Sequence, residues 1–448
     1  MNPSKKPNVI FFFTDQQRFD TTGVHGNPMG LTPNFDRIAM EGTHCYHAFT
    51  PQPVCLPARM VLQTGKYASQ LQTYTNAGEL PADEETLGHW FRDAGYETAY
   101  IGKWHMMHED PVPPERRTGY DYFLGSNVLE FTTDDYRFET YDGDGNLVRL
   151  PGFRVDAQTD AAIRYIDDHQ EKPFFMFLSF LDPHFQNSRD DYPAPIGYEE
   201  RYQECWTPPD LKALGGSSAR HLPGYYGMVK RLDEALGRLR DALLSLDMLD
   251  NTIIVYTTDH GCHFKTRNGE YKRSCHDSSI RIPMAFSGPG FQSGGRLQEM
   301  ISLIDIPPTL LDACDIPIPD TMQGRSILPL TRGDREGWPE EMYSEICDGR
   351  LVRAVRTKRW TYSVRYTENA SRPTAAWAFE EDELYDLKAD PWQLNNLIDR
   401  ASHSEVRRVM RERLVRRMQD AGEQAPTIHE VDVKPGGQKQ LREEEIHQ

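Results

Sequence analysis

Cys55 lies in the stretch QPVCLPARMVLQTGKY, where it could be a packing thiol, a nucleophile or the precursor of another reactive group. Pro57 and the helix formers that follow it predict a helix beginning near Cys55. A helix N-terminus favours negative charge, and Arg59, one turn later, lies on the same face and could reach back to the Cys55 side chain. Such surroundings would also lower the pKa of a thiol, so an ordinary cysteine nucleophile stays open.

Two pairs of metal-ligand residue types follow apolar runs. Asp15 and Gln16 come after VIFFF, and Asp259 and His260 come after TIIVY. One Asp at a strand end would ordinarily cap a turn, but two pairs could converge on one cation. Oxygen ligands suit calcium or magnesium, while His260 leaves manganese or zinc open.

Four cationic or imidazole side chains could surround a neighbouring oxyanion. Lys103 and His105 stand two residues apart in IGKWH, so in an extended segment both point to the same side. His184 follows a proline in LDPHF, and Lys272 lies in YKRSCHDSSIRIP. Together with a metal, these residues describe a pocket for sulfate or phosphate.

Buried strands must position these residues. The apolar runs are continuous rather than alternating, which is typical of strands covered on both faces, and helical patterns lie between them. This order predicts an α/β fold, with a large, mostly parallel sheet sandwiched by helices, over a catalytic domain of residues 1–334. In such sheets the site lies beyond the carboxyl ends of the strands, where Asp15, Lys103, His184 and Asp259 would all fall.

The remaining residues, 335–448, show a different pattern of predicted secondary structure. They predict a smaller α+β subdomain with a short-stranded antiparallel sheet, an amphipathic helix over SEVRRVMRERLVRRMQDAG and a loose polar tail, KPGGQKQLREEEIHQ. The Arg-rich helix also carries acidic residues and an apolar stripe, so it favours a docked surface helix over a nucleic-acid contact.

Composition excludes several classes of protein. The 448 residues carry a net charge of −18, which argues against binding to nucleic acid or an anionic membrane. No run approaches the ~18 apolar residues of a membrane span, and no signal peptide is visible, so we expect a cytoplasmic protein. The seven cysteines show no CxxC spacing, and the six besides Cys55 are expected to be packing residues. The sequence predicts no particular oligomeric state.

The motifs together resemble the sulfatase family of the alkaline phosphatase superfamily. The resemblance extends along most of the chain. It rests on these segments: PNVIFFFTDQQR, TPNFDRIAMEG, the Cys-x-Pro-x-Arg signature, GYETAYIGKWH, FLSFLDPH, TTDHG, KRSCHDSSIRIP, MQGRSILPL and ELYDLKADPWQLNNL. It implies an alkaline-phosphatase-like fold and hydrolysis of a sulfate ester to an alcohol and inorganic sulfate.

The resemblance also implies that a separate maturation enzyme oxidises Cys55 to formylglycine. One hydroxyl of the hydrated aldehyde would attack sulfur, and collapse of the remaining hemiacetal would release sulfate. Arg59 and Lys103 would orient the diol and His105 would assist its deprotonation. His184 and Lys272 would hold the sulfate ester, and one of them would protonate or stabilise the leaving oxygen.

The family resemblance assigns the metal ligands as Asp15, Gln16, Asp259, His260 and the modified Cys55. Relatives often carry Asp where this chain has Gln16 and Asn where it has His260. Together, the two differences lower the negative charge around the ion. Calcium is still the metal we expect, with magnesium, manganese and zinc as alternatives.

The expected substrate is a sulfated carbohydrate or another small sulfate ester, cleaved in an exo-acting manner. The alternatives are a phosphonate monoester or phosphodiester hydrolase of the same superfamily, which tends to lack GKWH, a phosphatase or mutase that uses unmodified Ser or Thr, and a non-catalytic sulfate-binding protein. Candidate substrate contacts flank the motifs: Asn76, His108, Arg116, Arg117, Arg201, Trp206, His263 and Arg267.

Overall fold

A ten-stranded sheet forms the centre of the larger part of the protein. The computed structural model describes residues 6–292, 294–366, 378–435 and 441–448. The strand order is β10-β2-β9-β8-β1-β7-β3-β4-β5-β6, and the central pairs β8-β1, β1-β7, β7-β3 and β3-β4 are parallel. The strands are β1 (Asn8–Thr14), β2 (Thr43–Phe49), β3 (Glu97–Lys103), β4 (Tyr122–Ser126), β5 (Phe138–Tyr141), β6 (Leu147–Leu150), β7 (Phe174–Ser179), β8 (Thr252–Thr258), β9 (Ala285–Ser287) and β10 (Gly295–Ser302).

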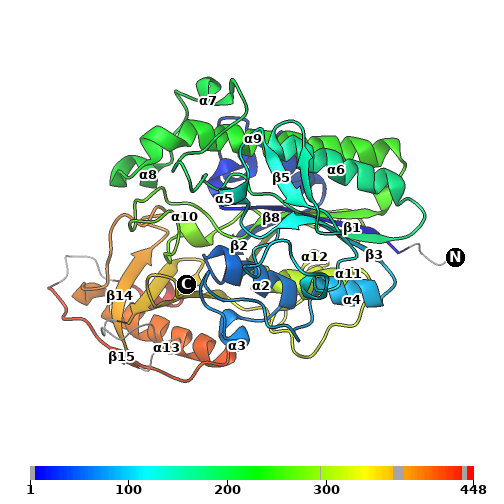
Figure 1. The fold of residues 1–448 in the computed structure, drawn as a ribbon. Coiled ribbons are helices and arrows are strands. Elements are labelled where there is room, and N and C mark those ends of the chain that lie inside the picture. The colour runs from blue at the N-terminus through cyan, green and yellow to red at the C-terminus, as the bar shows by residue number, and fades with distance from the viewer. Residues whose placement is uncertain (1–5, 293, 367–377, 436–440) are drawn as a thin grey trace.

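Helices cover both faces of this sheet, so the predicted α/β sandwich is confirmed (Figure 1). One face carries α1 (Pro33–Glu41), α6 (Arg154–Asp168) and α9 (Ser218–Ser245), and the other carries α2 (Cys55–Thr64), α4 (Leu87–Asp93) and α11 (Ile306–Ala313). Shorter helices are α3 (Ala68–Leu71), α5 (Leu129–Thr132), α7 (Tyr198–Arg201), α8 (Pro209–Leu214), α10 (Asp277–Ile280) and α12 (Leu328–Thr331).

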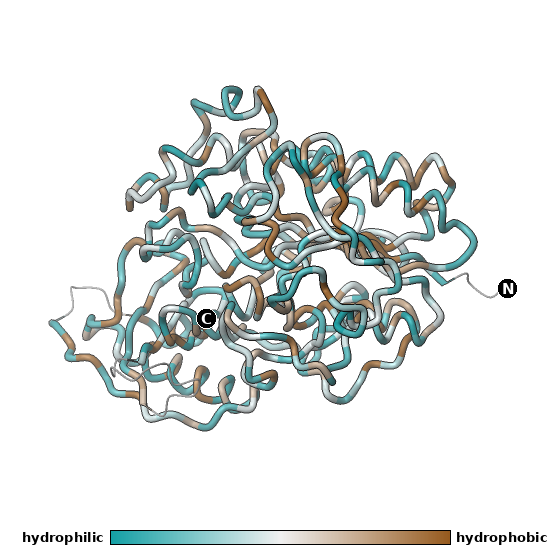
Figure 2. Tube along the Cα trace, in the orientation of Figure 1, coloured by the Kyte–Doolittle hydropathy of each residue, from teal (hydrophilic) through white to brown (hydrophobic). Residues whose placement is uncertain are grey.

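The central strand β1 explains why the runs are continuously apolar. Phe11 and Phe13 pack in the core with α2, α4 and α11, whereas Ile10 and Phe12 pack in the core with α1, α6 and α9. Every β1 residue is buried, and the apolar residues of the central strands gather in the interior (Figure 2). Burying each phenylalanine contributes roughly 1.5–3 kcal/mol, so the strand ends are held firmly in place.

A second sheet follows, with the order β11-β12-β13-β14-β15. Its strands are β11 (Glu341–Ile346), β12 (Val352–Thr357), β13 (Trp360–Arg365), β14 (Ala378–Asp386) and β15 (Thr427–His429), and α13 (Ser404–Asp420) packs on it. The β12–β13 hairpin and the α13 helix agree with the sequence patterns. The sheet is not wholly antiparallel, because β15 pairs with β14 in parallel.

The expectation of a loose polar tail was wrong for its described residues. The last helix, α14 (Glu443–Ile446), docks on the second sheet: Trp360 donates its indole N–H to the Glu445 carbonyl at 2.9 Å, and Arg359 pairs with the Glu445 carboxylate at 3.1 Å. Ile446 also packs against the apolar core of that sheet. Residues 436–440 of the predicted tail lie outside the described residues.

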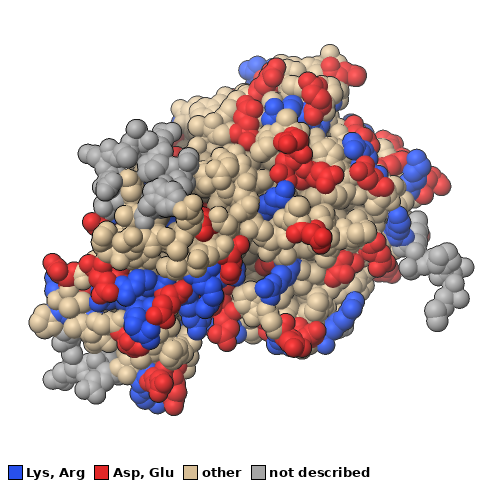
Figure 3. Space-filling view, turned by 90° about the horizontal axis from the view of Figure 1, so that it is seen from below, with Lys and Arg blue, Asp and Glu red and all other residues tan. Residues whose placement is uncertain are grey.

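Surface charge is mixed. On the face drawn in Figure 3, Lys and Arg lie interspersed with Asp and Glu. Among the described residues, no helix combines the length and apolar character that a membrane crossing requires.

Gly102, the neighbour of Lys103, provides a test of how tightly the ends of β3 and β7 are packed against each other. Its φ is +113°, and a Cβ added there would lie 1.9 Å from the Ser179 carbonyl oxygen. Gly95 also has a positive φ, +83°, but open space around it. Gly95→Ala should therefore cost only the roughly 1–2 kcal/mol of left-handed strain, whereas Gly102→Ala should cost about 1–3 kcal/mol more from overpacking. Urea denaturation midpoints of the two variants measure the difference, and equal midpoints would contradict the tight packing.

Candidate active site

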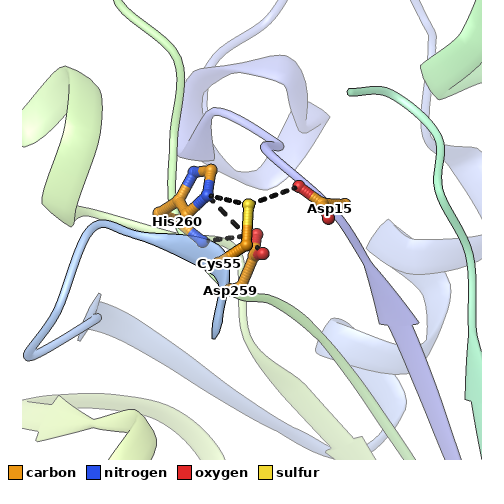
Figure 4. A group of neighbouring side chains, drawn as sticks. All are labelled: Asp15, Cys55, Asp259 and His260. Atoms are coloured by element: carbon orange, nitrogen blue, oxygen red, sulfur yellow. Dashed lines mark hydrogen bonds and ion pairs between the residues drawn. The ribbon is translucent and has the colours of Figure 1, made fainter. Parts of the chain in front are cut away.

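Four candidate metal-binding side chains meet at one edge of the large sheet. Asp15 directly follows β1, Asp259 and His260 directly follow β8, and Cys55 is the first residue of α2. Their ligand atoms lie within 4.8 Å of one another, and all four residues are buried (Figure 4). The strand ends therefore bring together residues that lie up to 245 positions apart in the sequence, as Asp15 and His260 do.

Asp15 is the carboxylate of the group that pairs closely with two cationic side chains. It accepts Arg59 Nη2 and Lys103 Nζ, each at 2.9 Å, and Lys103 also pairs with Glu130 at 3.0 Å. Burial alone would raise the pKa of Asp15, but the charges of Lys103 and Arg59 outweigh it and hold that pKa well below its usual value. Asp15 is therefore ionised at neutral pH.

Asp259 presents an oxygen that has no hydrogen-bond partner within the described residues, although it lies 3.9 Å from Arg59 Nη2. Its Oδ1 accepts the backbone N–H groups of Gln16 and His260, each at 2.9 Å, while Oδ2 accepts no hydrogen bond within the described residues. Burial and the nearby Asp15 charge raise the pKa of Asp259 to about 7. A carboxylate in this position would be stabilised by a cation between it and Asp15.

Gln16 and His260 complete an oxygen- and nitrogen-rich cradle. Gln16 adopts a φ of +67°, and its buried Oε1 has no hydrogen-bond partner within the described residues. Burial, followed by the charge of Lys272, lowers the pKa of His260 well below its usual value, so its imidazole is the neutral form that binds metals. The orphaned buried oxygens of Gln16 and Asp259 thus fit a divalent cation.

Cys55 is 1% exposed, and its thiol is not activated as a thiolate. Its Sγ lies 2.6 Å from Lys272 Nζ, 3.3 Å from His260 Nε2 and 3.8 Å from Asp15 Oδ1. Burial and the Asp15 charge nevertheless raise the pKa of Cys55 to about 12. Burial and the anionic neighbours therefore disfavour the alternative of a low-pKa cysteine nucleophile, despite the helix N-terminus.

Arg59 contacts a different partner from the one that its helix position predicts. Rather than hydrogen bonding to the Cys55 side chain, it binds Asp15 and donates Nη1 to the Lys103 carbonyl at 2.9 Å and to Ser179 Oγ at 2.8 Å. Its guanidinium also lies over the Phe13 ring, 5.1 Å from the centroid. Arg59 therefore ties α2 to the ends of β1, β3 and β7.

Three further cationic or imidazole residues lie near Cys55. Lys272 Nζ is 3.1 Å from His260 Nε2 and 3.4 Å from His184 Nε2. His184 Nδ1 bonds its neighbour's carbonyl at 2.7 Å, which leaves Nε2 directed toward Lys272. Burial lowers the pKa of both His184 and His105, so these imidazoles are neutral.

The GKWH segment is not extended throughout, contrary to the sequence interpretation. β3 ends at Lys103, and His105 has a φ of +45°. His105 is nonetheless buried near Lys103 and Arg59, and its Nδ1 has no partner within the described residues. The turn, rather than strand alternation, brings the two side chains to the same region.

The structure places several candidate substrate contacts in internal roles instead. His263 is 0% exposed, and its Nε2 bonds the Lys272 carbonyl at 2.9 Å. Arg267 donates to the Gln393 and Trp392 carbonyls, each at 2.8 Å. Arg117 likewise holds backbone carbonyls and is 8% exposed. These side chains support loops, because each of them hydrogen bonds to at least one backbone carbonyl.

The other candidates lie at different places. Asn76 Oδ1 accepts the Leu56 N–H at 3.1 Å, directly beside Cys55. His108 and Arg201 are exposed, and Arg201 lies over the Tyr202 ring. Arg116 bonds the Leu80 carbonyl, and the backbone of Trp206 contacts Met29 and Tyr226.

The sequence patterns did not identify the residues that hold Lys103, Arg59 and the Lys272 loop in place. Glu130 and Ser179 bind Lys103 and Arg59, but neither residue type stands out in its own segment. The loop that carries Lys272 is pinned to the second sheet just beyond that residue: Cys275 donates to Glu383 at 2.9 Å. Asp277 then forms a buried ion pair with Arg356 at 2.9 Å. No local sequence pattern predicts such contacts between distant segments.

Comparison with known proteins agrees with the geometry. The sulfatase family model matches residues 7–316, and a model described as N-sulphoglucosamine sulphohydrolase, C-terminal, matches residues 269–420. An ulvan-active sulfatase of Formosa agariphila is 30% identical over 94% of this chain and 82% of its own.

Two solved structures share the fold. One, described as a complex with its substrate D-glucosamine-2-N,6-O-disulfate, has a TM-score of 0.77 and 23% identity, over 93% of this chain and 98% of that one. The other, the phosphonate monoester hydrolase of Agrobacterium radiobacter, has a TM-score of 0.68 and 24% identity, over 92% of this chain and 96% of that one.

Divalent cations should stabilise the folded protein through the Asp15–Asp259 cradle. After treatment with EDTA, adding a cation at about a hundred times its dissociation constant should contribute about 2.7 kcal/mol, seen as a higher melting temperature. Asp259→Asn should remove most of this response, whereas Asp190→Asn, at an exposed ion pair with Lys265, should keep it. Calorimetry with calcium, magnesium, manganese and zinc measures the shift. No response to any of them, or an unchanged response in Asp259→Asn, would contradict the site.

Proposed function

The chain belongs to the sulfatase family, and we propose that it hydrolyses sulfated saccharides by means of a formylglycine made from Cys55. The observation that carries this proposal is the position of Cys55. It lies at the start of α2, buried among Asp15, His260 and Lys272, with a thiol pKa raised to about 12. A protonated thiol is a poor nucleophile, but a hydrated aldehyde at the same point offers two hydroxyl groups.

The first step transfers the sulfuryl group to the protein. One hydroxyl of the hydrate attacks sulfur and loses its proton, while the bond from sulfur to the substrate oxygen breaks and the alcohol leaves. The nearby His105 is the candidate proton acceptor, and its neutral state suits it to this role. The product is a sulfate ester on the side chain of residue 55.

The second step regenerates the aldehyde. The remaining hydroxyl loses its proton, its oxygen forms a double bond to carbon, and the carbon–oxygen bond to sulfate breaks. Addition of water then restores the hydrate. A serine or cysteine adduct has no second hydroxyl and therefore cannot release sulfate by this route.

Cationic side chains would hold the charge of the sulfate group throughout. Lys272 lies 2.6 Å from Cys55 Sγ and next to His184, so the pair can bind sulfate oxygens, and one of them can protonate or stabilise the leaving oxygen. Lys103 and Arg59 orient the hydrate through their shared contact with Asp15. A bound divalent cation, for which calcium is our proposal, would add Lewis acidity beside Asp15, Gln16, Asp259 and His260.

A formylglycine requires a partner, because the chain contains cysteine at position 55. We therefore propose that a separate maturation enzyme acts on the CLPAR segment before the protein folds. The burial of Cys55 supports this order, since a 1% exposed thiol is inaccessible in the folded state.

The saccharide part of the proposal rests on relatives. One relative is described as ulvan-active, and a protein of the same fold binds a glucosamine disulfate. The fold alone does not separate the two activities considered, because the phosphonate monoester hydrolase shares it. The sulfatase family match and the GKWH segment favour the sulfate ester.

A substrate panel tests the proposal directly. Protein produced together with a maturation enzyme should cleave sulfated mono- and disaccharides and an aryl sulfate faster than an aryl phosphonate monoester, with slow phosphonate turnover since the pocket accepts any tetrahedral oxyanion. Cys55→Ala should lower kcat by at least ~1000-fold, whereas Cys205→Ala, at a half-buried cysteine elsewhere, should leave it unchanged. A preference for the phosphonate would overturn the assignment.

A further inference from the structure

The turn between β11 and β12 of the second sheet brings a carboxylate to the edge of the active site. Asp348 Oδ2 pairs with Arg273 Nη2 at 3.1 Å and lies 3.5 Å from the backbone nitrogen of Asn76. Arg273 directly follows Lys272 in the chain, and Asn76 Oδ1 holds the N–H of Leu56, the residue after Cys55. Asp348 is therefore one contact away from two of the segments that form the site.

This carboxylate differs from the buried ones behind it. The side chains of Asp348 and Arg273 are 16% and 19% exposed, whereas those of Asp15 and Asp259 are 0% exposed. Its second oxygen, Oδ1, takes part in no contact found within the described residues. Asp348 is thus fixed through one oxygen and retains a free acceptor beside the segments that carry Lys272 and Cys55.

A second polar group of the same turn is also free. Arg350 is exposed, and it forms no ion pair within the described part of the chain. Gly349, between the two, has a φ of +75°, which permits the tight turn that presents both side chains from one loop. The turn thus carries an acceptor, the anchored carboxylate of Asp348, and donors, the guanidinium of Arg350.

We propose that Asp348, oriented by Arg273, is a specificity-determining residue that accepts hydrogen bonds from ring hydroxyls of the sugar bearing the sulfate. The inference rests on the proposed sulfatase function and adds the group that recognises the saccharide. Adjacent hydroxyls of a sugar match the acceptors of a carboxylate, and such charge-assisted hydrogen bonds are strong. An aryl sulfate lacks these hydroxyls and gains nothing from Asp348.

The test compares two substrates in the same variants. The substrates are the best of a panel of sulfated monosaccharides and 4-nitrophenyl sulfate. Asp348→Ala should lower kcat/KM for the sugar sulfate at least ~10-fold, mainly through KM, and should change the aryl sulfate value less than ~3-fold. Asp348→Asn, which keeps the shape, should show the same selectivity with a smaller loss. The control is Glu270→Gln, an exposed carboxylate 3.9 Å from Arg273, which should match the wild type on both substrates.

The outcomes separate this inference from the proposed function. Equal losses on both substrates would show that Asp348 acts only by holding the Lys272 loop, and unchanged activity on the sugar would show that it makes no contact; each result overturns the inference. A wild-type protein that cleaves the aryl sulfate but no sugar sulfate would overturn the inference and leave the sulfatase assignment intact. A protein that cleaves no sulfate ester at all would overturn the proposed function itself.

Discussion

The buried ion-paired carboxylate of Asp15 connects the parts of the active site. It accepts Arg59 from α2 and Lys103 from β3, and it lies within 3.8 Å of Cys55 Sγ. A charge at this depth is tolerated only because these partners compensate for its lost hydration. Removing either cation would leave the anion only partly compensated, and removing Arg59 would also loosen the helix that carries Cys55. The same anion raises the pKa of the thiol and, with Asp259, makes the site favourable for a cation.

The second sheet lies outside the catalytic cluster and fixes the loop that carries Lys272. Cys275 and Asp277 attach the loop that carries Lys272 to β14 and β12, and His263 holds the Lys272 carbonyl from the large-sheet side. Lys272 is therefore clamped from two directions, which suits a group that must hold charge without reorganising. The β11–β12 turn adds the partly exposed Asp348, which pairs with Arg273 next to Lys272. The strand ends of the large sheet thus carry Asp15, Lys103 and Asp259, while the second sheet positions the loop that carries Lys272.

Much of this arrangement could be predicted because it follows from local patterns. Continuous apolar runs mark strands buried on both faces, so Asp15, Lys103 and Asp259 were expected at strand ends. Pro57 marks the first turn of the helix that starts at Cys55. These signals lie within a few residues of the features that they describe, and no tertiary packing overrides them.

The remainder depends on contacts between distant segments. Arg59 turns to Ser179 and Asp15 rather than to Cys55, because β1, β3 and β7 lie adjacent beneath it. The direction of the Cys55 pKa depends on burial depth, which a sequence pattern does not state. The His105 turn breaks strand alternation, and the α14 helix gains its partners only where Trp360 and Arg359 meet it.

The mass of the peptide that spans Cys55 tests the central claim most directly. When the protein is produced with a maturation enzyme, the account predicts a loss of about 18 Da, as expected for replacing a thiol by an aldehyde, in a fraction that rises in proportion to specific activity. The same peptide from a host without that enzyme should carry the intact thiol, and its protein should be inactive. Full sulfatase activity in protein whose Cys55 peptide shows only the unmodified thiol would contradict the account.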